Sequence, residues 1–227
     1  MTPDLDTLFP LFRDAWILHD DGDVIVIDKP SGMSTHETEP GDLDHAVARL
    51  AAHLRARGER DYLGIHQRLD KDTSGVLLFS RNPARNKALA AEFEGRHVEK
   101  AYIAGVILPR NVAPKGTLRS FLVKEKGGVV SVFAKKPMRG VPQEAITHYR
   151  VLDRKGDRAL LAVKPETGRM HQIRAQLAHA GMPVAGDPLY GGSPCSRLLL
   201  HAERLTLAHP ATGRRFDISS NPPDVFT

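Results

Sequence analysis

The chain has 227 residues, of which 41% are hydrophobic and 26% are charged. This composition is typical of a globular protein with a sizeable core, and it excludes the disordered, collagen-like and membrane-embedded classes. No repeat, low-complexity segment or long linker interrupts the sequence. We therefore expect one domain over residues 1–227, with its core at about 15–220.

The balance of charges is moderately basic. Lys and Arg number 32 against 27 Asp and Glu, which gives a net charge of +5 and an isoelectric point near 9.4. Such a balance suits a polyanionic partner such as nucleic acid, but it is equally common in proteins without one.

Cysteine content and hydropathy indicate the cellular compartment of the protein. Cys195 is the only cysteine in the sequence, which excludes an internal disulfide and a cysteine-rich zinc site. No apolar run is long enough to span a bilayer, and the first residues, with Asp4, Asp6 and Asp14, do not form a secretory signal. We expect a soluble cytoplasmic protein that makes no membrane contact.

The first half of the chain predicts two strands and two helices. An apolar, β-branched run at 23–28 predicts a buried strand that delivers Lys29 to a Pro- and Gly-containing turn. Apolar residues at helical spacing predict an amphipathic helix over 44–57. A second strand is predicted at 75–79, and a second helix over 82–93, with Asn as its cap and Pro at its first position.

The second half predicts strands at 100–108, 159–163 and 205–208, and a helix from about His171 to Ala180. Because strands and helices mix without strict alternation, the fold class is α+β rather than a doubly wound parallel sheet. Segment 109–145 has weaker periodicity, and we expect it to form hairpins or a basic arm. Its basic residues include Lys115, Arg119, Lys124, Lys126, Lys135, Lys136 and Arg139.

The densest polar cluster lies at 64–75, in a loop that leads directly into an apolar strand. Loops held on rigid elements favour function, and this one holds Arg68, Asp70, Lys71 and Asp72. The plainer alternative is a solvated turn with local ion pairs.

A second cluster lies at 167–174, where a tight turn precedes a helix. His171 and Arg174 are three residues apart and share one face of that helix. The helix N-terminus, with Arg169 and Arg174, offers donors to a phosphate or carboxylate. The alternative is a basic helix start on the surface.

Together the two clusters resemble the RluA-type family of pseudouridine synthases. The resemblance covers nearly the whole chain, in the family's order and approximate spacing. The matching segments read DKPSG at 28–32, HQRLDKDTSG at 66–75, KAY at 100–102, TGRMHQIR at 167–174, GDPLYG at 186–191 and LLLHA at 198–202.

The resemblance implies an enzyme that isomerises uridine to pseudouridine in ribosomal RNA, transfer RNA or both. It implies that Asp70 is the catalytic aspartate, that Tyr102 packs beneath the target base, and that Arg174 pairs with the aspartate. It also implies a mixed, mainly antiparallel central sheet with flanking helices and a basic catalytic cleft. The predicted RNA-binding residues are Lys29, Arg68, Lys71, Lys100, Arg169 and His171.

Two departures from the family pattern affect these expectations. Gln67 stands between His66 and Arg68, where the usual motif places His directly before Arg, so no role is carried over to His66. Too few residues precede the strand at 23–28 for the small RNA-binding module with which many relatives begin. We therefore expect a short form whose catalytic domain, including segment 109–145, selects the target.

Isomerising uridine breaks the bond between N1 and the ribose, rotates the base and rejoins it through C5. This chemistry needs no cofactor and no metal. A carboxylate such as Asp70 can act either as a nucleophile or as a base that removes a sugar proton. Because the target base must leave its stack, RNA is the expected partner and base flipping the expected route. We expect the enzyme to be a monomer.

Two other classes of protein are considered. A non-catalytic RNA-binding protein on the same fold has no need of Asp70, Tyr102 and Arg174 together. A metal-dependent hydrolase would use some of the 11 histidines, but the sequence contains no His-x-x-x-His pair with a supporting Glu.

Overall fold

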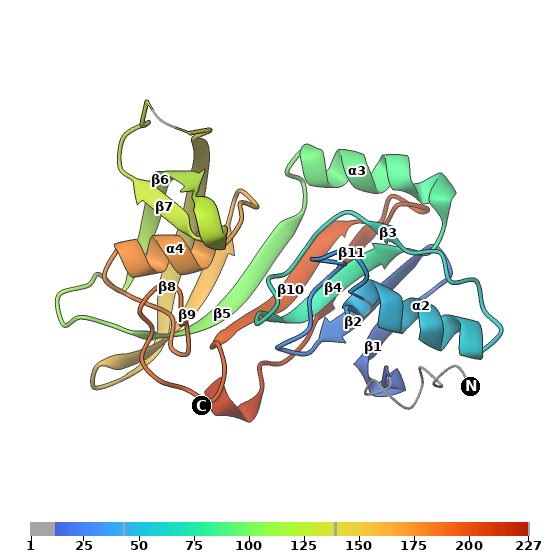
Figure 1. Cartoon of the computed structure of the whole chain (residues 1–227), viewed down its shortest axis with the longest axis horizontal. Helices are drawn as coiled ribbons and strands as arrows, with labels where there is room; N and C mark the ends of the chain where they lie inside the picture. The colour runs from blue at the N-terminus through green and yellow to red at the C-terminus, as the bar shows by residue number, and fades with distance from the viewer. Residues whose placement is uncertain (1–11, 43, 139, 227) are drawn as a thin grey trace. The chain divides into compact units, whose positions relative to one another are not determined.

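The computed structural model describes residues 12–42, 44–138 and 140–226 (Figure 1). These residues form two compact units. The first unit takes the described residues up to Val98 together with Leu207–Ser220, and the second takes Glu99–Thr206 together with the described residues from Asn221 onward. Both units combine helices with strands, which confirms the predicted α+β class.

In the first unit, β2 pairs antiparallel with β1 and with β4, and β3 pairs antiparallel with β4. β2 and β4 are buried along nearly their whole length, so their sequences are continuously apolar rather than alternating. The elements are β1 (Ile17–Asp20), β2 (Val24–Lys29), α2 (Ala46–Ala56), β3 (Gly64–Ile65), β4 (Ser74–Ser80), α3 (Asn86–Glu94) and β11 (Arg215–Ser219), with short 3₁₀ turns at Asp14–Trp16 and Pro83–Arg85.

Both helices of the first unit begin close to the predicted residues. Nδ1 of His45 accepts the N–H of Ala48 at 3.2 Å and caps α2. The amide oxygen of Asn82 accepts the N–H of Ala84 at 3.1 Å, as the capping prediction required. The chain then makes a 3₁₀ turn before α3, so the second helix begins more tightly wound than we expected.

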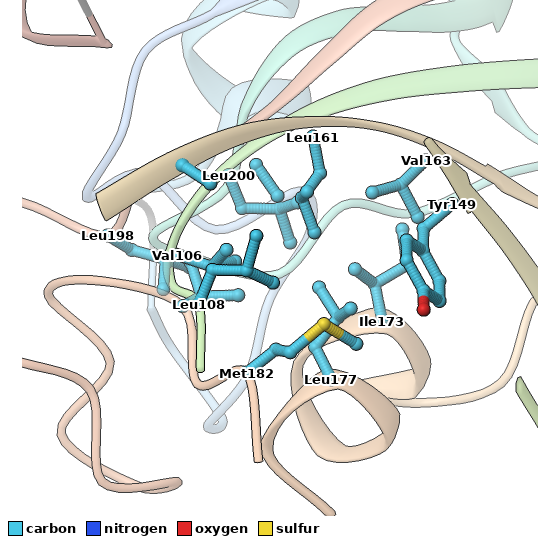
Figure 2. Close-up of a cluster of buried hydrophobic side chains, with 13 residues drawn as sticks. Val106, Leu108, Tyr149, Leu161, Val163, Ile173, Leu177, Met182, Leu198 and Leu200 are labelled. Carbon is cyan, nitrogen blue, oxygen red and sulfur yellow. The ribbon is translucent and has the colours of Figure 1, made fainter. Parts of the chain in front are cut away.

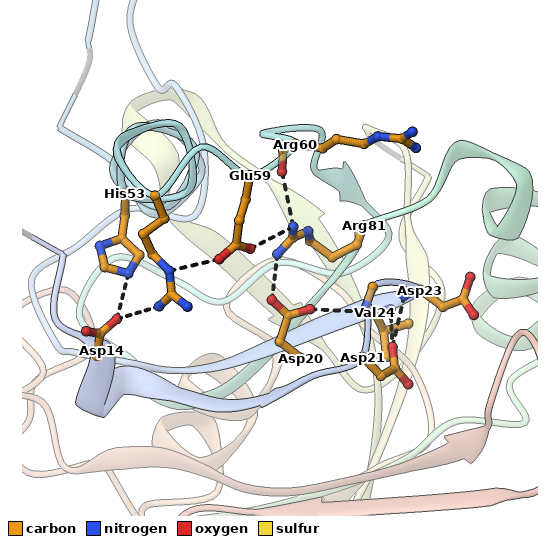
Figure 3. Close-up of polar contacts among 11 residues, drawn as sticks. Asp14, Asp20, Asp21, Asp23, Val24, His53, Glu59, Arg60 and Arg81 are labelled. Atoms are coloured by element: carbon orange, nitrogen blue, oxygen red, sulfur yellow. Dashed lines mark hydrogen bonds and ion pairs between the residues drawn. The ribbon is translucent and has the colours of Figure 1, made fainter.

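Ion pairs join the loops at one end of the first unit (Figure 3). Arg81 contacts the carboxylates of Asp20 at 2.5 Å and Glu59 at 3.2 Å, and it donates to the carbonyl of Arg60. Asp21 contacts the ring of His209 at 2.8 Å. These pairs connect segments that lie far apart in the sequence.

Asp21 provides a test of stability against pH. Burial by itself raises the pKa of the Asp21 carboxyl, but the N–H of Val24 and the ring of His19 outweigh it, and the pKa falls from 3.8 to about 2. A lowered pKa means that the ionised carboxylate stabilises the fold above pH 3.8, and that this contribution is lost as the pH falls toward 2. Asp21→Asn is expected to lower the free energy of unfolding by about 1 kcal/mol at pH 7 and by much less near pH 2.

Urea unfolding between pH 7 and pH 2.5 checks this expectation. Asp153→Asn, which changes an exposed carboxylate of the second unit, is the control. If Asp21→Asn lowers the free energy of unfolding by the same amount at every pH, the charge of Asp21 does not contribute to stability.

In the second unit the strands are antiparallel and follow the order β10, β5, β9, β8, β6, β7. α4 lies across β6, β7 and β8 (Figure 1). The elements are β5 (Glu99–Ile107), β6 (Lys115–Lys124), β7 (Val130–Phe133), β8 (Gln143–Lys155), β9 (Arg158–Pro165), α4 (Gln172–His179) and β10 (Leu200–Ala208), with a 3₁₀ turn at Asp224–Phe226.

The core of the second unit forms between α4 and the sheet. Figure 2 shows Ile173 and Leu177 pointing from α4 toward Leu161, Val163 and the ring of Tyr149. Leu161 and Leu177 are fully buried, and such leucines typically contribute about 2–5 kcal/mol each when compared with alanine. This core fixes α4, and therefore the cluster at 167–174, on the sheet.

Segment 109–145 forms the β6–β7 hairpin and leads into β8, which confirms the predicted hairpin. Arg139 lies outside the described residues. The exposed basic residues that the structure describes in this segment are Arg110, Lys115, Arg119, Lys124, Lys126, Lys135 and Lys136. Among the residues that the structure describes, no helix is both long and apolar enough to cross a membrane.

Candidate active site

Asp70 lies in the loop between β3 and β4, and it is half-buried. The N–H of Thr73 donates to the carbonyl of Asp70 at 3.1 Å and closes a tight turn. Thr73 and Ser74 are buried, so the loop passes directly into the rigid β4. The predicted catalytic carboxylate therefore stands on a firmly held turn.

Lys29 holds this loop from within. Its side chain is 0% exposed, and Nζ donates to the carbonyl oxygens of Pro30 at 3.0 Å, Met33 at 2.6 Å and Lys71 at 2.9 Å. A buried ammonium requires such partners, because an unpaired charge is costly away from water. We predicted that Lys29 binds RNA, and we now reassign it to a structural role, since its charge is enclosed by the loop.

Two hydroxyl groups fix the backbone on either side of Asp70. Thr35 Oγ1 donates to the carbonyl of Leu69 at 2.9 Å and accepts the N–H of Leu69 at 3.0 Å. Ser31 Oγ donates to the carbonyl of Asp72 at 2.7 Å. Sequence reasoning did not single out Thr35, and the only signal for Ser31 was its place in the DKPSG match.

Arg68 and Lys71 are exposed, as residues that bind RNA must be. Nη1 of Arg68 lies 3.4 Å from Nε2 of His36. Burial, followed by the charges of Arg68 and His45, lowers the pKa of His36, which favours the neutral ring. A neutral His36 can accept a hydrogen bond from Arg68, which orients the guanidinium.

His66 and the interposed Gln67 face the interior of the first unit. Nε2 of His66 lies 3.3 Å from Oδ1 of Asn86, and the ring stacks on Phe93. Gln67 is buried, and its Nε2 has no hydrogen-bond partner among the described residues. His66 therefore has a packing role next to α3.

In the second unit, Lys100 and Tyr102 are two residues apart in β5, so their side chains lie on the same face of the sheet. Tyr102 is half-buried and packs against the core cluster that contains Ile173. Burial lowers the pKa of Lys100, whose Nζ lies 3.6 Å from the place that a Cβ on Gly168 would occupy. The structure thus brings Lys100 next to the 167–174 cluster.

Glutamine side chains shape the turn that precedes α4. Gln172 accepts the hydroxyl of Thr167 at 2.7 Å and the N–H of Arg169 at 3.1 Å, and it donates to the carbonyl of Ile146 at 3.0 Å. One helical turn later, Gln176 donates to the carbonyl of Ala145 at 3.0 Å. Sequence reasoning gave neither glutamine a role, although their four-residue spacing places both on one face of α4.

Arg174 is buried rather than exposed on the surface of the helix. Its Nε and Nη2 donate to the two carboxylate oxygens of Asp187 at 2.7 and 2.9 Å, and only 4% of the Arg174 side chain is exposed. This corrects the prediction that Arg174 offers a fork to phosphate from the helix surface. Arg169 is half-buried, and its Nε lies 3.4 Å from the carbonyl of Glu144.

His171 precedes α4 instead of forming its first turn. Its φ of 51° is left-handed, and α4 begins at Gln172. Nδ1 of His171 lies 3.0 Å from the hydroxyl of Tyr190, whose ring also faces Arg174. The structure therefore brings His171 and Arg174 together through Tyr190. Asp70 belongs to the other unit, so its pairing with Arg174 stays a prediction.

Comparison with known proteins identifies the class. The family model described as RNA pseudouridylate synthase matches residues 23–179. The chain therefore belongs to the RNA pseudouridine synthase family, as the resemblance to its RluA-type members indicated, and it is an isomerase.

Three curated relatives show the extent of the similarity. The ribosomal large subunit pseudouridine synthase D of Pseudomonas aeruginosa is 32% identical, over 92% of this chain and 69% of that protein. The uncharacterized RNA pseudouridine synthase YhcT of Bacillus subtilis is 31% identical, over 91% and 68%. The tRNA pseudouridine synthase C of Yersinia pestis is 31% identical, over 90% and 85%. The chain thus spans about two thirds of the length of the first two.

Solved structures show the same fold. Human RNA Pseudouridylate Synthase Domain Containing 4 matches with a TM-score of 0.75 and 24% identity, over 93% of this chain and 90% of that one. The predicted pseudouridine synthase fold is therefore confirmed.

Proposed function

We propose that this chain isomerises specific uridines in ribosomal RNA or transfer RNA, with Asp70 as the catalytic carboxylate. The observation that carries the proposal is the half-buried Asp70 on a turn whose backbone is fixed by Lys29, Ser31 and Thr35. The names of the relatives, which act on large-subunit ribosomal RNA and on transfer RNA, support both substrate classes.

The reaction exchanges one bond for another. The bond from N1 to C1′ breaks, the uracil rotates, C5 bonds to C1′, the C5 hydrogen leaves as a proton, and N1 takes up a proton. The carboxylate of Asp70 either bonds to C1′ while N1 departs, or removes a proton from the sugar and returns it later. In both routes we assign the pairing and orientation of Asp70 to Arg174, and the support of the base to the flat ring of Tyr102.

We also propose that the hydroxyl of Tyr102 takes part in a late proton transfer, and Tyr102→Phe tests this role. The variant keeps the ring and loses the hydroxyl, so RNA affinity is expected to stay within about threefold while turnover falls by about 10²-fold, the size of a lost proton transfer. Rapid quenching followed by nucleoside analysis is expected to show a species that is neither uridine nor pseudouridine. Wild-type turnover in Tyr102→Phe would remove the proton-transfer role.

RNA contacts are assigned to the exposed cations of both units. Arg68 and Lys71 flank the Asp70 turn, and the basic side chains of segment 109–145 supply further charge. Contacts between these cations and RNA phosphates offset part of the free energy of unstacking the target base, which is a few kcal/mol. We further propose a cytoplasmic monomer, and sedimentation of the purified chain with and without RNA checks its oligomeric state.

Pseudouridine mapping tests the proposed function. Carbodiimide-dependent stops of reverse transcription are compared across all RNA from cells with and without the gene. Loss of one or a few discrete sites, restored by wild type and not by Asp70→Asn, is expected and names the substrate. An unchanged map would favour the non-catalytic RNA-binding protein.

A further inference from the structure

The GDPLYG segment forms a rigid turn beside α4. A Cβ on Gly186 would lie 1.9 Å from the carbonyl oxygen of Arg197, and a Cβ on Gly192 would lie 2.0 Å from that of Val184. Real Cβ atoms essentially never show such distances, so the first residue of the turn and Gly192, directly after it, are pressed against neighbouring backbone. The backbone of the turn is thereby held in place.

Asp187 anchors this turn and Arg174 at once. Its carboxylate is fully buried and receives two hydrogen bonds from the guanidinium of Arg174. Oδ1 also accepts the N–H of Leu189 at 3.0 Å and the N–H of Tyr190 at 3.3 Å. These two backbone N–H groups orient the Asp187 carboxylate independently of its pairing with Arg174.

Tyr190 places its ring against the guanidinium of Arg174. Its ring centre is 5.4 Å from the guanidinium carbon. Its hydroxyl accepts the N–H of Val130 at 2.9 Å and lies 3.0 Å from Nδ1 of His171. The ring is further packed against a small apolar cluster that includes Ala175 of α4.

We propose that Asp187 and Tyr190 are positioning residues for the isomerisation, acting through Arg174 and, for Tyr190, also through His171. Asp187 occupies the Nε and Nη2 edge of the guanidinium, and the Tyr190 ring limits its rotation, so the Nη1 edge points in one direction. A bidentate pair fixes geometry as well as charge. This inference rests on the proposed function, because it assumes that Arg174 orients the attacking carboxylate.

A purely structural role of the Arg174–Asp187 pair predicts a different result. Buried ion pairs contribute little net stability compared with well-packed apolar residues. If the pair served stability alone, Asp187→Asn would lower activity only in proportion to the unfolded fraction. If the pair directs Arg174, the folded variant itself reacts slowly, because small displacements at a reacting centre cost about 10²-fold.

The test is a double-mutant cycle on the full chain. The variants are Asp187→Asn, Arg174→Lys and the two combined, with Tyr190→Phe and Tyr190→Leu to separate the hydroxyl from the ring. Asp20→Asn, which changes another arginine partner far from this turn in the sequence, is the matched control. The probe is [5-³H]uridine-labelled total RNA from cells lacking the gene, since isomerisation releases the C5 tritium to water.

Single-turnover tritium release, RNA affinity by filter binding and thermal unfolding are measured for each variant. We expect Asp187→Asn to lose about 10²-fold in rate, with RNA affinity within about threefold, at temperatures where it is folded. In the Arg174→Lys background the same change is expected to cost nothing further, because the residue acts through Arg174. Tyr190→Leu should lose more than Tyr190→Phe, while Asp20→Asn keeps the wild-type rate.

The outcomes separate this inference from the proposed function. No tritium release by wild type would overturn the proposed function. An active wild type and an inactive Arg174→Lys, together with a fully active Asp187→Asn, would overturn the positioning role alone. Equal losses from Asp187→Asn in both backgrounds would also overturn it. If Asp187→Asn fails to fold, the two Tyr190 variants still test the proposal. A wild-type rate of tritium release in both Tyr190→Phe and Tyr190→Leu would contradict it.

Discussion

Asp70→Asn is expected to abolish turnover, by at least about 10³-fold, while RNA binding survives. An amide of the same shape can neither bond covalently to C1′ nor hold a proton taken from the sugar. The turn itself should remain intact, because Lys29, Ser31 and Thr35 grip backbone atoms around position 70 rather than its side chain. Tritium release from labelled RNA measures turnover, and filter binding measures affinity.

Asp72→Asn is the matched control for this prediction. Asp72 lies two residues further along the same turn, and Ser31 binds its carbonyl oxygen rather than its carboxylate. We expect its rate to stay within about threefold of wild type, which would show that the effect belongs to one carboxylate and not to the charge of the loop. Full turnover by Asp70→Asn would refute the assignment of the catalytic group.

Lys29→Met is expected to give the largest loss of stability, about 3 kcal/mol or more. Methionine fills a similar volume but leaves the carbonyl oxygens of Pro30, Met33 and Lys71 without the ammonium that now donates to them, and the bond to Met33 is buried. The turn should loosen as a result, so the rate of tritium release should fall even at temperatures where the chain is folded. Urea unfolding and single-turnover kinetics measure the two effects.

Lys71→Met is the control for Lys29→Met, because its exposed side chain belongs to the same loop. It should leave the free energy of unfolding nearly unchanged and weaken RNA binding, since it removes a cation offered to phosphate. The opposite pattern, with Lys29→Met stable and deficient in RNA affinity, would restore the RNA contact first predicted for Lys29.

The sequence predicted the elements whose burial leaves a strong pattern. β2 and β4 are continuous apolar runs, and α2 has regular apolar spacing and a clear C-terminal Gly58. β8 beyond position 145 was missed because Ala145, Ile146 and Thr147 are all buried and no alternation marks the strand. β1, β3 and β11 were missed because they are short and border on turns.

For the site, the resemblance located the residues but not their surroundings. Lys29 was predicted to bind RNA because a strand delivers it to a loop. Its partners are carbonyl groups, which every residue possesses, so the sequence carries no sign of them. Likewise, Arg174 and Asp187 are 13 residues apart and meet only through the fold of the intervening turn.

The hydrogen bonds from Lys29 to the backbone of its loop affect how this enzyme can change its RNA target. Its ammonium donates to the main-chain oxygens of Met33 and Lys71, so the side chains of these two residues do not enter these hydrogen bonds. Side chains on the turn can therefore be exchanged during evolution, or by an engineer, without disturbing the path of the backbone at Asp70. Lys71 is exposed, and a library at that position should yield variants that prefer other RNA sequences while retaining the same reaction.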